Sequence, residues 1–191
     1  MRDAGVGRVL LASLHQGIAD ILPTRLGFYE SWLHAKGLRD GTIDLAPLYA
    51  VLSFLRQEGD LSYARITTSA GEYAAEWTVQ SMGSFDRALL RTAPNWLRNR
   101  LVLRLGNRLV HASYRPSRLA SRLRKGVATL DLRGSVFCDV REPVPHPLCG
   151  FYTSALARLF ALFSVPAKIE IISCRGAGGG ACAMTVRIEQ D

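Results

Sequence analysis

The feature that most constrains the fold is a change of hydrophobic period late in the chain. Before residue 126, apolar side chains recur every three or four residues, which is typical of helices. After it, residues 127–136 alternate apolar and polar side chains, and two apolar-rich segments, 167–174 and 182–189, flank a glycine-rich turn. Alternation predicts strands, and two strands joined by a short turn pair antiparallel. We therefore expect an α/β (α+β) fold, with N-terminal helices packed on a mainly antiparallel sheet that has a C-terminal hairpin.

Helices are expected over several stretches with apolar stripes. These are residues 6–21, 28–36, 44–56, 63–80, a stretch that begins at Pro94, and residues 148–164. Residues 63–80 carry small side chains where another backbone can approach closely, namely Ala70, Gly71, Ala74 and Ala75. A shorter basic piece, 117–125, repeats the pattern of Leu and Arg and stops at Gly126, as a further helix would. Residues 142–147 contain three prolines and are expected to form an extended loop.

The length and composition are those of one globular domain. The chain has 191 residues, of which 48% are hydrophobic and 21% charged, and this composition excludes a disordered protein. We expect a helical part over residues 1–85 and a core over residues 86–191. No export signal is visible, and the longest apolar stretch, 151–165, contains Arg158 and is too short to cross a bilayer. A cytoplasmic location and reduced cysteines are therefore expected.

The positive charge of the chain is concentrated in one segment. The net charge is +8, and between Arg87 and Lys125 there are eleven basic residues and no acidic one. The helix that begins at Pro94 carries parallel ridges of leucine and arginine: Leu97, Leu101, Leu105 and Leu109, and Arg100, Arg104 and Arg108. A solvated basic face is the first interpretation, and an acidic protein partner, an anionic ligand or a membrane surface stays open. Nucleic acid is the least favoured partner, because only Trp96 and Tyr114 offer rings for stacking.

A pair of cysteines brackets the glycine-rich turn. The segment from Cys174 to Cys182 reads Cys-Arg-Gly-Ala-Gly-Gly-Gly-Ala-Cys, and Cys149 precedes the expected helix before it. This arrangement over residues 127–189 resembles the 4-vinyl reductase domain family, with Gly176 where that family commonly has Ala. The resemblance implies a fold related to subunits of the TRAPP vesicle-tethering complex, with a hydrophobic pocket between helices and sheet. It also implies bacterial relatives that sense aromatic compounds or assist bacteriochlorophyll synthesis.

The resemblance further implies a zinc ion held by three cysteines and a glutamate. Cys149, Cys174 and Cys182 fall on the three cysteine positions. The position of the glutamate is occupied by Ile171, and Glu170 is one residue out of register, which in a strand turns its side chain to the opposite face. His146, three residues before Cys149, is an alternative fourth ligand.

The residues alone give the same cysteines two main interpretations. Thiolates at the start of a helix and at both ends of a hairpin can converge on a tetrahedral zinc ion, with Zn–S bonds of about 2.3 Å. Free cysteines are also among the most commonly buried side chains, so simple packing stays open, as does a redox pair. Cys138 has no partner at a recognisable spacing and is expected in the core.

These observations favour a binding module over an enzyme. The expected ligand is a small hydrophobic or tetrapyrrole-like molecule, and the expected role is that of an accessory, delivery or sensor protein. The oligomeric state stays open, and a homodimer through an apolar helix face is one alternative. The residues expected around the ligand are His111, Tyr114, Phe137, Phe151, Tyr152 and Phe160. A TRAPP-like assembly subunit that docks through its basic helix, and a vinyl-group reductase, are the alternatives.

No signature of catalysis or of a nucleotide cofactor is present. Residues 176–181 read as Gly-x-Gly-x-x-Ala, but a dinucleotide site needs a helix next, and the following residues alternate as a strand does. We therefore expect neither NAD nor flavin. The four histidines are scattered along the chain, which leaves a catalytic triad unsupported.

Overall fold

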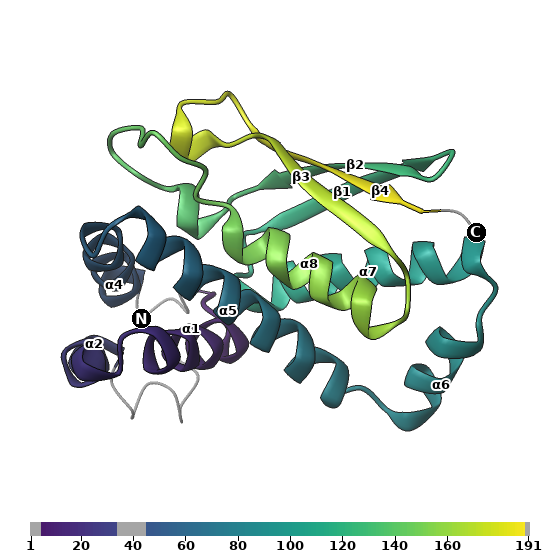
Figure 1. Ribbon diagram of the computed structural model, residues 1–191, viewed down its shortest axis with the longest axis horizontal. Helices are drawn as coiled ribbons and strands as arrows, with labels where there is room; N and C mark the ends of the chain where they lie inside the picture. The colour runs from purple at the N-terminus through teal and green to yellow at the C-terminus, as the bar shows by residue number, and fades with distance from the viewer. Residues whose placement is uncertain (1–4, 34–44, 190–191) are drawn as a thin grey trace.

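The protein is a two-layer arrangement of helices against one sheet. The computed structural model describes residues 5–33 and 45–189, and within these ranges it has seven α-helices and a four-stranded antiparallel sheet. Figure 1 shows the helices gathered on one face of the sheet, with α7 and α8 directly beneath the strands. The expected mixture of helices and a mainly antiparallel sheet is thus confirmed.

The bounds of the elements follow the sequence pattern closely at most places. The helices are α1 (Arg8–Ile21), α2 (Leu26–Leu33), α4 (Leu45–Gln57), α5 (Asp60–Gln80), α6 (Ser84–Thr92), α7 (Asn95–Ser113) and α8 (Gly150–Leu162), with short 3-10 turns at η1 (Pro23–Arg25), η2 (Val136–Cys138) and η3 (Arg175–Ala177). The strands are β1 (Arg118–Arg124), β2 (Val127–Arg133), β3 (Ala167–Ser173) and β4 (Cys182–Ile188). Residues 34–36 of the predicted helix over residues 28–36, with His34 among them, lie outside the described residues. None of the helices in the described ranges is both long and apolar enough to pass through a bilayer.

The sheet has the strand order β1-β2-β4-β3, and every neighbouring pair is antiparallel. The expected C-terminal hairpin is formed by β3 and β4. Buried side chains alternate with more exposed ones along β4. The buried ones are Cys182, Met184, Val186 and Ile188. This face meets the helices, so the period-two pattern in the sequence marks the side of the sheet that is buried.

The prediction of a helix over residues 117–125 is wrong, because most of this segment is strand β1. Arg124 pairs with Val127 across a two-residue turn, and both turn residues, Lys125 and Gly126, have positive φ angles of 46° and 76°. That conformation is the hairpin turn whose twist matches the strands on either side. Gly126 therefore closes a β-hairpin, where a helix stop was expected.

Helices α5 and α8 cross closely at the centre of the molecule. A Cβ atom added at Gly71 would lie 2.3 Å from the carbonyl oxygen of Phe151 and 2.1 Å from Ser154 Oγ. The neighbouring Ala70 and Ala74 are fully buried. Of the small residues predicted for close approach, Gly71 is the one at which α5 meets the backbone of α8, whereas Ala70 lies against Gly17 of α1.

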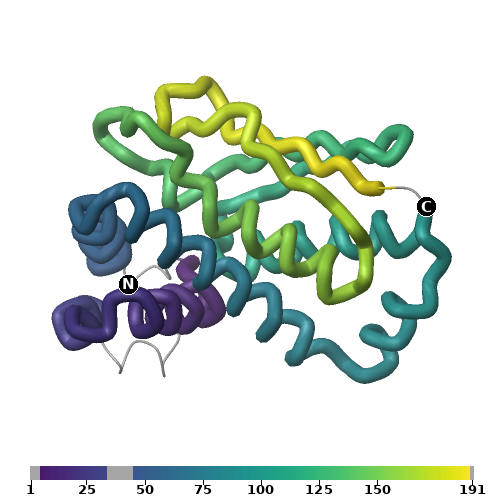
Figure 2. Tube along the Cα trace, in the orientation of Figure 1, coloured from purple at the N-terminus to yellow at the C-terminus, as the bar shows by residue number. Residues whose placement is uncertain are grey.

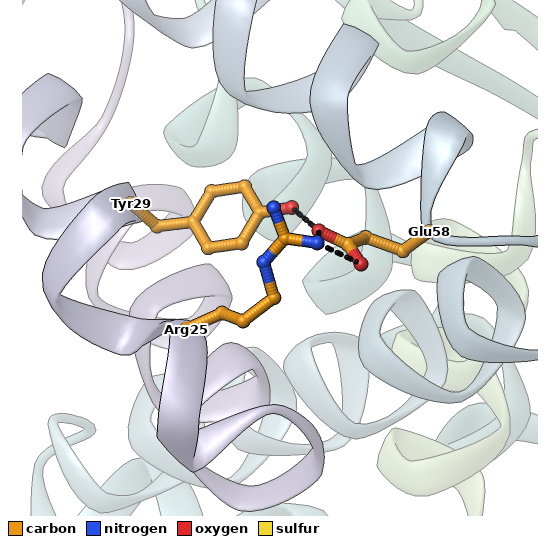
Figure 3. Close-up of polar contacts among 3 residues, drawn as sticks. All are labelled: Arg25, Tyr29 and Glu58. Atoms are coloured by element: carbon orange, nitrogen blue, oxygen red, sulfur yellow. Dashed lines mark hydrogen bonds and ion pairs between the residues drawn. The ribbon is translucent and has the colours of Figure 1, made fainter.

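A polar anchor joins the N-terminal helices to one another. Glu58, just after α4, accepts hydrogen bonds from Tyr29 of α2 and from Arg25 of η1, each at 2.8 Å (Figure 3). Tyr29 is completely buried, so its hydroxyl has no access to water. Burial and the hydrogen bond to Glu58 together raise the pKa of Tyr29 well above its usual value. The tyrosine thus stays a hydrogen-bond donor at every physiological pH.

Candidate metal and ligand site

Four buried cysteines meet at one end of the sheet. The sulfur atoms of Cys138 and Cys149 are 3.1 Å apart, and that of Cys174 lies 3.5 Å from the first and 3.3 Å from the second. The sulfur of Cys182 completes the group, in which all four atoms lie within 4.8 Å of one another. These separations exceed the S–S bond of about 2.05 Å, and all four residues are free thiols.

Four separate chain segments deliver these thiols. Cys138 ends the short turn η2 after β2, and Cys149 directly precedes α8, while Cys174 follows β3 and Cys182 begins β4. Because β2 and β4 are antiparallel, the end of one strand lies beside the start of the other, and Leu132 pairs with Cys182. Figure 2 shows the loop from β2 to α8 running beside the turn between β3 and β4.

The glycines of the β3–β4 turn allow it to close on this loop. A Cβ atom at Gly176 would lie 2.7 Å from Leu148 Cδ1, and the carbonyl oxygen of Gly176 accepts a hydrogen bond from the backbone of Val144. Gly178 has a φ angle of 84°, which favours glycine. The glycine-rich segment therefore serves a tight turn that leads into β4, as the sequence predicts.

Backbone donors and mutual hydrogen bonds set the charge of the thiols. The backbone N–H of Leu148 points at Cys174 Sγ at 3.3 Å, and that of Arg175 points at Cys182 Sγ at 3.4 Å. Hydrogen bonds from Cys138 and Cys149 lower the pKa of Cys174, and the bond from Leu148 adds to this effect. The pKa of Cys182 is lowered as well, whereas the pKa values of Cys138 and Cys149 are raised, so Cys174 and Cys182 are the members that favour thiolate, the form that binds metal ions.

The donor set fits a tetrahedral metal ion. Four ligands at about 2.3 Å from one ion have sulfur atoms roughly 3.8 Å apart. The sulfur atoms of Cys138, Cys149 and Cys174 are slightly closer, at 3.1–3.5 Å, and all four lie within 4.8 Å of one another. Of the predicted ligands, Cys149, Cys174 and Cys182 are brought together. The fourth member is Cys138, which is buried in the core as expected but was not predicted as a ligand. Glu170, the carboxylate nearest in sequence, is instead bound to Lys168 and Arg187, and these neighbours lower the pKa of Glu170.

His146, the expected fourth ligand, does not belong to the group of converging donors. Its Nδ1 atom lies 3.3 Å from Asp60 Oδ2, and its ring is beside that of Tyr63, with centroids 6.3 Å apart. Tyr63 is 1% exposed, and its hydroxyl has no hydrogen-bond partner among the described residues. Burial raises the pKa of Tyr63, and the neighbouring cysteines raise it further. A neutral hydroxyl without a partner thus lies close to the thiols.

Three aromatic rings are packed next to the cysteines. Phe137 precedes Cys138, and its ring stacks on that of Phe151 with centroids 4.9 Å apart. The ring of Tyr152 meets both edge-on, at 5.6 Å and 5.1 Å. All three residues are completely buried, and Tyr152 Oη lies 3.4 Å from Ser117 Oγ. This aromatic cluster, defined by Phe137, Phe151 and Tyr152, contains three of the residues predicted to contact a ligand.

The other predicted ligand residues lie in different surroundings. Phe160 is buried further along α8. His111 is exposed on α7, where its Nδ1 atom is 2.7 Å from a guanidinium nitrogen of Arg118, so it does not face the aromatic cluster. Tyr114 is 9% exposed and interacts with Tyr49, whose hydroxyl donates a hydrogen bond of 2.6 Å to Asp139.

An open groove lies outside the residues that carry the thiols. Its volume is about 710 Å³, and Tyr49, Arg56 and Asp139 are among its lining residues, together with the loop over residues 140–144. This groove was not predicted from the sequence. Tyr49 donates a hydrogen bond to Asp139 within this lining, and Asp139 is next in sequence to Cys138. The groove is thus linked to the thiol cluster through the neighbouring residues Cys138 and Asp139.

Comparisons with known proteins give likeness in structure only. No family model and no curated protein matches the chain. A mutant H-NOX protein from K. algicida in its unliganded Fe(II) form aligns over 97% of this chain and 98% of its own, with 14% identity and a TM-score of 0.64. An H-NOX protein from S. oneidensis in the Fe(II)NO state aligns over 97% and 100%, with 11% identity and a TM-score of 0.53. The phenol-responsive sensory domain of the transcription activator PoxR, with phenol, aligns over 76% and 75%, with 14% identity and a TM-score of 0.53.

Proposed function

We propose that this chain is a sensory or delivery module that binds a small aromatic ligand beside a zinc ion held by Cys138, Cys149, Cys174 and Cys182. The observation that carries the proposal is the convergence of four buried thiols next to a buried aromatic cluster, each of which includes residues from the start of α8. The fold, which is similar to that of a phenol-responsive sensory domain, supports the same role.

Zinc suits this site better than other metal ions. Four cysteine ligands with no open position form a structural zinc site, and soft thiolates disfavour magnesium and calcium. The ion would join the start of α8 to the end of β3, to the start of β4 and to the turn after β2. Its role would therefore be structural: it would fix the position of the aromatic cluster relative to the sheet.

The chemistry of the aromatic cluster indicates the class of ligand. Flat rings that stack and meet edge-on favour another aromatic ring, and the hydroxyls of Tyr152 and Ser117 offer a hydrogen bond to a polar substituent. The Tyr63 hydroxyl, buried without a partner in the described part of the chain, is a second group that a ligand can satisfy. Because the rings of the cluster contact one another, one of them has to move for a ligand to enter. This favours a single substituted ring over a tetrapyrrole.

The proposal is tested by native mass spectrometry combined with thermal unfolding. We expect one zinc ion per chain, and the same spectra report the number of subunits and any retained ligand. Phenol at about 100 times its dissociation constant should add about 2.7 kcal/mol to the free energy of unfolding. For a chain of this length that is a rise in melting temperature of roughly 5–10 °C.

Two tyrosine variants make the test specific. Tyr152→Phe removes the hydroxyl of the aromatic cluster and should reduce the shift caused by phenol. Tyr29→Phe removes an equally buried hydroxyl in the N-terminal helices and should leave the shift unchanged. If phenols, simple hydrocarbons and porphyrins all fail to raise the melting temperature of the zinc-loaded protein, the ligand part of the proposal is wrong. If the purified protein holds no metal and takes up none, the zinc part is wrong.

A further inference from the structure

One corner of the molecule exposes large apolar side chains that the proposed ligand site does not use. Phe85 and Leu89, one turn apart on α6, are 77% and 48% exposed, and Trp96, at the start of α7, is 62% exposed. Figure 1 shows α6 projecting away from the sheet, at the far end of α5. Exposed aromatic residues on a projecting element mark an interaction surface more often than isolated exposed residues do.

A row of arginines continues from this corner along the outer side of α7. Arg100, Arg104 and Arg108 follow Trp96 at intervals of four residues, and all four side chains are exposed. The guanidinium of Arg100 lies over the ring of Trp96, 5.7 Å from its centroid. On the opposite side of the same helix, leucines such as Leu105 are buried in the core. α7 is thus anchored by its leucine side and presents its arginine side outward.

Two other arginines fix the corner in place. Arg87 donates hydrogen bonds to the carbonyl oxygens of Gln80 and Met82, at the end of α5. Arg98 donates in the same way to Arg91 and Ala93, at the end of α6, both at 2.9 Å. These contacts satisfy carbonyl groups that helix ends leave free. The exposed side chains therefore stand on a preformed scaffold that needs no folding on binding.

The arginine row carries its charge without nearby acidic partners. None of the ion pairs between described residues involves Arg100, Arg104 or Arg108. The sequence between Arg87 and Lys125 contains no acidic residue at all. The charge is therefore directed outward, and an anionic partner is the complement that it fits.

We propose that this face, defined by Phe85, Leu89, Trp96, Arg100, Arg104 and Arg108, binds the surface of an anionic lipid membrane. Tryptophan and phenylalanine insert at the level of lipid headgroups, and each arginine near an anionic leaflet adds attraction. A convex corner can enter a bilayer interface without a matching cavity, whereas a protein partner has to supply one. The apolar pair on α6 also has no use on the phosphate backbone of a nucleic acid. The binding is peripheral, because the described helices do not span a bilayer.

The test is sedimentation of the full chain with lipid vesicles. The protein should sediment with vesicles of phosphatidylcholine mixed with phosphatidylglycerol, and not with vesicles of phosphatidylcholine alone. Raising the salt from about 0.1 M to about 1 M shortens the Debye length from about 10 Å to about 3 Å, and should release most of the bound protein. The double variant Arg104→Gln/Arg108→Gln should weaken binding to the mixed vesicles by at least about tenfold.

A matched control removes the same charge elsewhere. Arg65 and Arg141 are exposed and lie outside the basic segment, so Arg65→Gln/Arg141→Gln should leave binding nearly unchanged. Phe85→Ser/Leu89→Ser keeps every charge and should still weaken binding, since it removes the inserted apolar groups. The proposal is overturned if the two arginine pairs have equal effects, if the apolar variant binds as the parent does, or if the parent ignores anionic vesicles. Binding to polyglutamate or duplex DNA in the absence of vesicle binding would assign this face to a protein or to nucleic acid.

Discussion

The contact between α5 and α8 makes Gly71→Ala a sensitive test of the whole arrangement. The added methyl group would lie 2.3 Å from the Phe151 carbonyl oxygen and 3.0 Å from the backbone nitrogen of Ala155. Ordinary contacts begin near 3.4 Å, so the two helices have to separate by about 1 Å. Overpacking of this kind costs about 1–3 kcal/mol, and the upper end applies because the obstacle is backbone. Alanine returns about 1 kcal/mol through its higher helix propensity, which leaves a net loss of about 2 kcal/mol.

Thermal unfolding followed by circular dichroism measures this loss. For a chain of this size, about 2 kcal/mol corresponds to a fall in melting temperature of roughly 4–8 °C. The matched control is Gly27→Ala, at an exposed position of α2 with no atom within 4 Å of the added Cβ. That variant gains helix propensity without a clash and should melt at the same or a higher temperature. If Gly71→Ala is as stable as Gly27→Ala, the close crossing of α5 and α8 is refuted.

Two further substitutions test the metal site and the N-terminal anchor. Cys138→Ser should reduce zinc affinity by more than about 100-fold, because even the loss of a residue that only hydrogen-bonds to a metal ligand costs up to about that much. Competition with a chromophoric chelator measures the affinity. Retention of zinc by Cys138→Ser together with its loss in His146→Ala would restore the ligand set expected from the sequence. Glu58→Ala should lower the free energy of unfolding by about 1–3 kcal/mol, since it leaves the buried Tyr29 hydroxyl unpaired, whereas Tyr29→Phe removes both the hydroxyl and its need for a partner and should cost less. A smaller loss for Glu58→Ala than for Tyr29→Phe in urea unfolding would contradict this account.

The helices and the C-terminal strands could be predicted from hydrophobic period because each has one buried side. The segment 117–125 was misassigned because residues four apart share a face in both a helix and a strand. Leu119 is 4% exposed and Leu123 half-buried, and both face the helices from β1. Period alone cannot separate the two structures here, and the deciding signal is the turn at Lys125 and Gly126. Helix α6 was missed for a different reason: of its residues only Leu90 is buried, so no apolar stripe marks it.

The candidate site was predicted in part, and the missing member shows what spacing along the chain leaves out. Cys149, Cys174 and Cys182 lie beside a helix start and a hairpin, both of which are visible in the sequence. Cys138 reaches them only because β2 pairs with β4, a neighbour that is distant in sequence. Once that pairing is assumed, the end of residues 127–136 has to lie beside Cys182, and this signal points to Cys138. His146 satisfied the spacing rule, but its ring turns toward Asp60 and Tyr63.

The first turn of α8 links one of the thiols directly to the aromatic cluster. The carbonyl oxygen of Cys149 accepts a hydrogen bond of 3.1 Å from the backbone of Tyr152, so the two side chains are carried by the same few peptide units. In the proposed site, a metal ion bound to Cys149 and a ligand that displaces the ring of Tyr152 would therefore act on the same short stretch of backbone.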